Sequence, residues 1–455
     1  MTWAQSTWLR GLCTTLGLGL ALAGIAAVLT ALIYISPAAA FAVVLAPPAA
    51  LGVLRRPVWG VYAGLLAVAL EVAHIRFGYR ALTVGEQILL LTALVALGHM
   101  LVAEPVRLAP LHRGFLALVA IAAAGLLIAE DTSSIVRFIR VATLLLVLSV
   151  YVSRLSAAEQ ERVLICLVVS GALCGLGALL TTGPQEVLQG GEVISGRAEA
   201  GFAQPNVLGF YLVLCLAPAL VLLTDTSAWR RVFVGACAAS IVLGLALTLS
   251  RSSILGALVT VLVLLRSPAF RRELAMVLVL LVAIAAANWS AVARSPTVGV
   301  LSTRLSTLQT RSDRQQDSRL QIWSTTPSIV LQKPLLGWGE GNFRVAAERF
   351  NLLDPSDLAP FDHAHNVPLT IVAELGIIGL AVFVAFIAAI VAALSRALRH
   401  DGLEGRLALA VTASLSGLAV CSMLDYPART YTVLAAILIL LGVAAGLART
   451  APSRA

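Results

Sequence analysis

The feature that most constrains the fold is a succession of apolar blocks. Each is roughly 20 residues long, the length at which a helix crosses a hydrocarbon core about 30 Å thick. The chain has 455 residues, of which 59% are hydrophobic and 12% are charged, and that charged share is about half the share in an ordinary soluble domain. Short segments of alternating hydrophobicity, typical of a membrane β-barrel, do not stand out in the sequence. The pattern predicts an all-α polytopic membrane protein.

Up to fourteen apolar blocks can be counted, and because several are short we expect twelve to fourteen transmembrane helices. The blocks lie near residues 12–34, 38–54, 59–75, 87–103, 114–129, 135–153, 163–182, 206–224, 232–249, 253–265, 273–292, 367–395, 405–424 and 430–448. The first block is interpreted as a signal anchor rather than a cleaved signal peptide, because it is long and more spans follow. We expect one integrated membrane domain: an N-terminal bundle over 1–292, a large loop with short helices over 293–366, and C-terminal helices over 367–455.

The net charge of +9 comes almost wholly from arginine, since Lys333 is the only lysine. Most arginines fall in short loops between alternate blocks, which is the positive-inside pattern of cytoplasmic loops rather than a nucleic-acid surface. This alternation predicts that both termini are cytoplasmic and that the long 293–366 interval is extracytoplasmic. All six cysteines lie inside apolar blocks and are interpreted as small hydrophobic residues rather than as disulfide partners.

The densest polar stretch is Ser318–Leu380, which holds His363 and His365. Asn366 is a plausible N-cap for the next span. At that position the positive end of the helix dipole would disfavour an imidazolium at His365 and leave a neutral ring, which can accept a proton from a sugar hydroxyl. Two alternatives stay open. The histidines could be an ordinary polar helix entry, or they could ligate a metal together with a nearby aspartate, Asp362 or Asp354.

Arginines at the predicted outer boundary form the second group of candidates. They are Arg251 in LSRSS, Arg319 before LQIW, Arg197 in SGRAEAGF, and Arg137 with Arg140 on one helix face. Charged residues that border spans are costly and usually face a cavity or a partner. A guanidinium binds phosphate with two parallel hydrogen bonds, so such a group suits a lipid-linked pyrophosphate. The alternative is that each arginine simply reaches towards lipid headgroups.

Other polar positions complete the set. Glu374 lies about two turns into the span that follows His365, where it would pair with an arginine or take part in proton transfer. Asn206 marks a helix start, and we expect it to contact the substrate together with His363 and Glu374. The GWGEGNF stretch lacks the GK[ST] of a P-loop and predicts a tight loop that forms a flexible cover over the site. No cytoplasmic segment is large enough for a nucleotide domain.

Together these pieces resemble the O-antigen ligase and polymerase superfamily of bacterial inner membranes. The motifs are GFAQPNVLG, the SR pair of LSRSS, an R-x-x-x-W run that leads to PLLGWGEGNF, then HAHN and ELGIIGL. They cover residues 190–390, and the rest of the chain is similar by hydropathy only. Their order and spacing are specific to the superfamily, but they discriminate weakly among its members.

The resemblance implies a metal-independent, inverting glycosyltransferase with a GT-C-like architecture and no cofactor. An O-antigen ligase would move a glycan from undecaprenyl pyrophosphate to lipid A–core on the periplasmic face of the inner membrane, in lipopolysaccharide biosynthesis. The essential arginines of the family match Arg251 and Arg319, and its essential histidine matches His365. The partners expected on this basis are the lipid-linked glycan, the lipid A–core acceptor and membrane lipids, with no nucleic acid.

Several other functions remain possible on the sequence. An O-antigen polymerase shares the donor and the leaving group, and a protein O-oligosaccharyltransferase would carry a larger extracytoplasmic part after its last spans. A membrane transporter is a more remote alternative, but it would place ionisable residues or broken helices near the bilayer midplane. A non-catalytic membrane scaffold gives no reason for both histidines to adjoin the arginine-bearing loop.

Overall fold

The computed structural model describes residues 49–73, 83–102, 106–180, 186–187, 193–194, 197–202, 204–224, 227–268, 270–271, 312–352 and 361–452. The chain divides into two compact units, Met1–Trp59 and Gly60–Ala455. Only residues 49–59 of the first unit are described, and they are mainly helical. The architecture and the site described below belong to the second unit.

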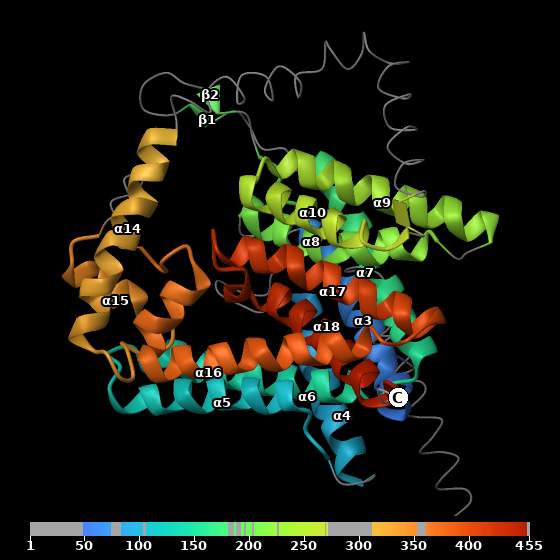
Figure 1. Ribbon diagram of the computed structural model, residues 1–455, viewed down its shortest axis with the longest axis horizontal. Coiled ribbons are helices and arrows are strands. Elements are labelled where there is room, and N and C mark those ends of the chain that lie inside the picture. The colour runs from blue at the N-terminus through green and yellow to red at the C-terminus, as the bar shows by residue number, and fades with distance from the viewer. Residues whose placement is uncertain are drawn as a thin grey trace, which may run out of the picture. The chain divides into compact units, whose positions relative to one another are not determined.

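Helices dominate the described part of the chain (Figure 1). The first half contains α3 Val58–Ala67, η1 Val68–Ala73, α4 Val84–Val102, α5 Pro110–Ala124, η2 Gly125–Leu127, α6 Thr132–Val152, α7 Ala157–Leu180, β1 Glu186–Val187, β2 Val193–Ile194 and α8 Pro205–Leu222. The second half contains α9 Ala228–Thr248, α10 Arg251–Leu264, α14 Ser312–Gln332, α15 Phe343–Arg349, α16 Val367–Ala397, α17 Gly402–Ser422, η3 Pro427–Arg429 and α18 Tyr431–Thr450. The strands β1 and β2 pair as one short antiparallel ladder.

The prediction of an all-α polytopic membrane protein is confirmed. Nine helices in the described part of the chain are long and apolar enough to cross a membrane, and Val58–Leu70 and Arg251–Leu264 are shorter apolar helices. Each predicted apolar block that falls within the described ranges corresponds to one of these helices. The blocks at 12–34 and 273–292, and most of the block at 38–54, lie outside the described residues.

Small residues let the helices approach closely, as is usual where lipid supplies no hydrophobic drive for association. A side chain at Gly256 of α10 would meet the backbone of Gly417 on α17, and one at Gly244 of α9 would meet Gly175 of α7. Helices α8 and α18 are the most completely buried candidate spans. Helix α16 runs beside α5 (Figure 1), and only 22% of the residues in its most apolar window are buried within the protein.

Helix α16 is broken near its start by Gly376, whose φ of 68° and ψ of −170° are not helical. This conformation is essentially restricted to glycine. The GWGEGNF loop lies against the break, where the N–H of Trp338 donates to Ala373 O at 3.0 Å and the N–H of Ile377 donates to Pro334 O at 2.9 Å. The loop is therefore tight, as predicted, but it is fixed to α16 by backbone hydrogen bonds and is not a flexible cover.

A small second core sits beside the first half of α16 and joins it to α14 and α15. Its largest fully buried members are Trp338 and Phe343. The helical spacing of SRLQIWSTTPSIVLQ predicts that Leu320, Trp323, Pro327 and Val330 lie near one face of a helix. Trp323 and Val330 do pack against this core, whereas Leu320 is 52% exposed and the fully buried residues of α14 include Ile322 and Ile329. Phe343 also begins the short helix α15.

Candidate active site

The two histidines lie in a tightly held turn at the start of α16. His365 has a φ of 48°, a left-handed conformation that is uncommon for residues other than glycine and is often found where the surrounding structure constrains a functional side chain. Asn366 caps α16 as predicted, accepting from the N–H of Leu369 at 3.0 Å. The indole N–H of Trp323 donates to Ala364 O at 2.9 Å, between the two histidines. The turn is thus held from α14 and from α16.

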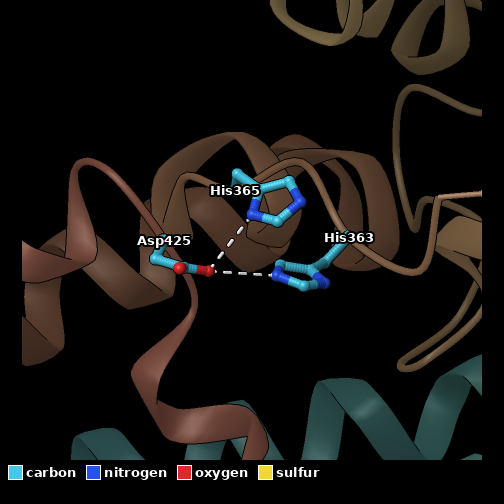
Figure 2. Close-up of side chains that lie close together, drawn as sticks. All are labelled: His363, His365 and Asp425. Carbon is cyan, nitrogen blue, oxygen red and sulfur yellow. Dashed lines mark hydrogen bonds and ion pairs between the residues drawn. The ribbon is translucent and has the colours of Figure 1, made fainter. Parts of the chain in front are cut away.

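Asp425, which follows α17, is the partner of both histidines. Figure 2 shows the two rings directed towards the same carboxylate, with His363 Nε2 and His365 Nδ1 each 3.2 Å from Asp425 Oδ1. Sequence reasoning missed Asp425. The one available signal was the polar DYPAR stretch, residues 425–429, in a short loop on the predicted outer side. The helix dipole alone therefore does not define the environment of His365, because a carboxylate lies within hydrogen-bond distance of its ring.

The hydrogen bonds fix where the protons lie. Burial would raise the pKa of Asp425, but the hydrogen bonds from His363 and His365 outweigh it and hold that pKa well below its usual value. Asp425 is thus an acceptor, and Nδ1 of His365 carries the proton that it donates. A neutral His365 then keeps its lone pair on Nε2, the arrangement that a general base needs.

A second layer orients the carboxylate. Asn206 Nδ2 donates to Asp425 Oδ2 at 3.0 Å, and Asn206 Oδ1 accepts from Arg197 Nη2 at 2.6 Å. Arg197 also donates through Nε to Thr248 O at 2.9 Å. The structure thus brings Asn206, Arg197 and His363 to the same network as His365. Their described hydrogen bonds position other protein groups, whereas the sequence interpretation assigned them to the substrate.

Unlike Arg197, Arg251 and Arg319 form no described hydrogen bond with the histidine network. Arg251 opens α10, whose N-cap Ser250 accepts from the N–H of Ser253, and it lies three residues after Thr248. Arg319 lies one helical turn before Trp323 on α14, hence on the same face. In the part of the chain that the structure describes, neither guanidinium forms a hydrogen bond or ion pair, and Arg251 is exposed. The predicted contact of both arginines with a phosphate stays a prediction.

Glu374 requires a correction. It is only 2% exposed, and its Oε1 accepts from the N–H of Phe343 at 3.1 Å. Among the described residues it forms no ion pair with an arginine, contrary to one sequence interpretation, and its predicted substrate contact stays a prediction. Glu374 instead fixes the glycine-rich loop to α16.

Glu340, in the same loop, is a further buried acid that sequence reasoning missed. Burial raises its pKa to about 7, against the opposing effects of Arg429 and of a hydrogen bond with Tyr426. Tyr426 follows Asp425 directly, and burial raises its pKa well above the usual value. A carboxyl and a phenol in low dielectric thus flank the histidine network.

Arg137 and Arg140 lie on α6, and both are exposed. Their described electrostatic neighbour is Tyr431, at the start of α18. No hydrogen bond among the described residues joins either arginine to the histidine network, so the structure does not unite them with His365. Their predicted contact with substrate stays a prediction.

The residues that could hold a metal differ from those expected from the sequence. His363, His365 and Asp425 offer atoms within 4.8 Å of one another, whereas Asp362 accepts from Arg429 at 2.8 Å and Asp354 lies outside the described residues. Arg429 Nη1 lies 2.9 Å from His363 Nδ1, and arginine can only donate. The proton of a neutral His363 is therefore on Nε2, which leaves no lone pair there for a metal and favours a hydrogen-bonded network.

The histidine network and Arg251 lie where α8, α10, α16 and α18 begin and where α9 and α17 end. Since helices that alternate in direction bring those ends to one side of a bundle, the fold and the network define a multi-pass membrane protein with a histidine–carboxylate site at one end of its helices.

Comparison with known proteins connects this class with a family. A family model described as O-antigen ligase matches residues 235–384, which include Arg251, Arg319 and His365. The match confirms the resemblance to the O-antigen ligase and polymerase superfamily and is consistent with a glycosyltransferase-like enzyme.

The other comparisons add little. No curated protein matches the chain. Among solved structures, one chain of a peptidoglycan synthase complex that coordinates polymerisation and crosslinking is 19% identical, with 74% of this chain and 97% of that chain covered and a TM-score of 0.39. That likeness is too low to define either the fold or the activity.

Proposed function

We propose that the protein is an O-antigen ligase, which transfers a glycan from undecaprenyl pyrophosphate to lipid A–core at the periplasmic face of the inner membrane. Both termini would be cytoplasmic and the reaction would be inverting and metal-independent. The observation that carries the proposal is the hydrogen bond from His365 Nδ1 to Asp425, which leaves Nε2 of a neutral ring free, within a chain whose residues 235–384 match the O-antigen ligase family.

In the proposed reaction His365 is the general base. Its Nε2 takes the proton from a hydroxyl of the acceptor sugar as that oxygen attacks the anomeric carbon. The new C–O bond forms while the bond from that carbon to the phosphate oxygen breaks, and its electron pair leaves with undecaprenyl pyrophosphate. The resulting imidazolium keeps its Nδ1–H on Asp425, whose negative charge stabilises it.

Arg251 and Arg319 would bind the pyrophosphate. Negative charge grows on the leaving oxygen, and donors that are already aimed at such charge lower the barrier without having to reorganise. Their lack of a described protein partner supports this role, because a guanidinium already paired with a carboxylate would have to give up that pair. The acyl chains of donor and acceptor would remain in the lipid that surrounds the apolar helices.

The test is reconstitution of the whole protein in liposomes with undecaprenyl-pyrophosphate glycan and lipid A–core. Native protein should transfer the glycan, and His365→Ala and Arg251→Ala should each lose nearly all transfer. Transfer that both changes leave intact would overturn the mechanism. Elongation of a lipid-linked acceptor without transfer to lipid A–core would identify a polymerase instead. Full activity in the presence of a chelator is expected, and loss there would establish a catalytic metal.

A further inference from the structure

Two histidines share one carboxylate oxygen at the site. Both ring nitrogens lie 3.2 Å from Asp425 Oδ1, and the ring centroids are 4.2 Å apart (Figure 2). Either imidazole could in principle accept a proton, since each would then be stabilised by the same negative charge. A protein that needs one base in one place must distinguish between them.

Arg429 contacts only one of the two rings in the described structure. Its Nη1 donates to Nδ1 of His363 at 2.9 Å, so that nitrogen holds a lone pair and the ring proton lies on Nε2. A second proton on His363 would place an N–H against the N–H of a guanidinium, next to a positive charge. Both nitrogens of His363 are thus occupied, one as an acceptor and one as a donor.

Arg429 is held in this position. Its Nη2 donates to Asp362 Oδ2 at 2.8 Å, and η3 ends at Arg429 itself. The charged groups that face His363 are therefore Asp425 after α17, Arg429 in η3, Asp362 in its own loop and His365 at the start of α16. Arg344 of α15 lies 3.9 Å from the other oxygen of Asp362.

The electrostatics agree with the geometry. Burial lowers the pKa of His363 to about 4, with His365 and Arg429 acting in the same direction and Asp425 against it. The Tyr426 ring, 6.0 Å from His363 between centroids, adds no charge of its own at neutral pH. His363 thus stays neutral across the range in which an ordinary histidine titrates.

We propose that Arg429 is a positioning residue that makes His365, and not His363, the base of the site. By occupying Nδ1 of His363 it keeps that ring a neutral donor to Asp425, and the negative charge of Asp425 is left to stabilise the imidazolium formed on His365. The proposal rests on the role of His365 under Proposed function. It also assigns His363 a positioning role in place of the substrate contact expected from the sequence.

The experiment compares Arg429→Gln, the double variant Arg429→Gln/His363→Gln and the control Arg344→Gln, at pH 6 and pH 8.5, in the reconstituted assay. Arg429→Gln removes both a positive charge and the guanidinium that occupies Nδ1 of His363 at an exposed position, so water can reach that nitrogen and the effect of burial on the pKa of His363 is reduced as well. His363 can then take a proton at pH 6 and oppose protonation of His365, so Arg429→Gln should lose about tenfold at pH 6 and less than about threefold at pH 8.5. The glutamine that replaces His363 cannot ionise and its amide still reaches Asp425, so the double variant should regain most of the pH 6 activity. Arg344→Gln should match the native protein.

Two results of this comparison of variants would overturn the proposal. One is a double variant no more active at pH 6 than Arg429→Gln, since a folding or packing defect would persist in both. The other is an equal loss at both pH values. Chelator-sensitive native activity restored by a divalent metal would also overturn it, because His363 Nε2 would then be a ligand rather than a donor.

A readout without turnover separates this inference from the proposed function. In protein labelled with ¹⁵N-histidine, the ring signals missing from His363→Gln identify His363. They should report a neutral ring at pH 6 in the native protein and a protonated ring in Arg429→Gln. A neutral ring in both proteins would overturn the role of Arg429 whatever the role of His365. An active His365→Ala variant with the expected signals would instead overturn the role of His365 as the base and leave the effect of Arg429 on His363 in place.

Discussion

The histidine cluster and the arginine pair beside it differ in how their polar atoms are used. In the cluster, both oxygens of Asp425 and both nitrogens of His363 have protein partners. Arg251 and Arg319 have none among the described residues. The first region is held together by hydrogen bonds within the protein, while the second has none among the described residues, as its proposed role requires. This contrast fits a site that fixes its base in advance and completes its phosphate contacts only on binding.

The largest effect should come from reversing the polarity of the cluster with Asp425→Asn. Arg197 donates to Asn206 Oδ1 and so directs the amide N–H₂ of Asn206 at residue 425. An asparagine there must turn its own N–H₂ away, towards the histidines. His365 would then accept on Nδ1 and carry its proton on Nε2, the wrong tautomer for a base. We expect transfer to fall by about 10⁴-fold, the loss seen when a base takes the wrong tautomer in other enzymes.

The exchange variant Asp425→Asn/Asn206→Asp is the matched control for Asp425→Asn. A carboxylate at position 206 accepts from Arg197 and from the new amide together, so the oxygen of that amide faces the histidines again. We expect the exchange variant to transfer glycan at least about tenfold faster than Asp425→Asn. It should not reach the native rate, because the carboxylate charge lies at position 206 instead of position 425. Equal activity in the two variants would show that tautomer control is not the function of this network.

A change at Arg251 or Arg319 should lower transfer without lowering stability, unlike a change within the histidine cluster. Arg251→Lys keeps the charge but loses the planar fork that binds phosphate with two hydrogen bonds. We expect transfer to fall by about 10²-fold while thermal unfolding stays within about 1 °C of native. Asn206→Ala, which removes a hydrogen bond of the histidine cluster, should lower both the rate of transfer and the temperature of thermal unfolding. If Arg251→Lys unfolds at a temperature several degrees below that of the native protein, Arg251 has a structural partner. The difference between the histidine cluster and the two arginines would then disappear.

The fold could be predicted from hydropathy, and His363, His365, Arg251 and Arg319 could be selected as candidates because they lie in short local motifs. Asp425 could not be found in this way. Its role depends on α17 ending beside the start of α16, a contact between residues 60 positions apart in the chain. The resemblance also stops at residue 390, short of Asp425 and Arg429.

The role of Glu374 was missed for a different reason. Burial cannot be read from its position in an apolar block, where an ion pair and a backbone acceptor look alike. On α14 the helical spacing placed Leu320 on the same face as Trp323 and Val330, but only Trp323 and Val330 pack against the second core, and Leu320 is exposed. In each case tertiary packing decided between patterns that the sequence leaves equal.

Gly376→Ala tests whether the glycine-rich loop belongs to the rigid region. Its backbone conformation is essentially restricted to glycine, and an added Cβ would meet the carbonyl of Leu335. We expect a loss of about 2 kcal/mol in stability, measured as a fall of a few degrees in the unfolding midpoint. Gly98→Ala is the matched control, since it lies in α4 with no atom near the added Cβ and should be neutral or slightly stabilising. Equal midpoints in the two variants would mean that the loop is free to adjust.

The smallest effect, and the one that depends on pH, concerns Glu340 at the edge of the cluster. Its pKa is raised from 4.5 to about 7, chiefly by burial, so between these values the folded protein retains a proton that the unfolded chain releases. Stability from this group is therefore complete at low pH and is lost as pH rises through about 7. Glu340→Gln keeps an oxygen for Tyr426 but cannot ionise. Its unfolding midpoint should equal that of native protein near pH 5 and exceed it by a few degrees at pH 8.

Exposed Glu348 of α15 supplies the control for Glu340, and Glu348→Gln should show no such dependence on pH. A midpoint difference for Glu340→Gln that is the same at pH 5 and pH 8 would mean that the carboxyl of Glu340 is ionised in the folded protein. Arg429 would then be the group that holds the charge on Glu340 in place. Arg429 would in that case interact with an ionised Glu340 as well as with His363. It would then oppose protonation of His363 less strongly, and the difference between the two histidines would be smaller.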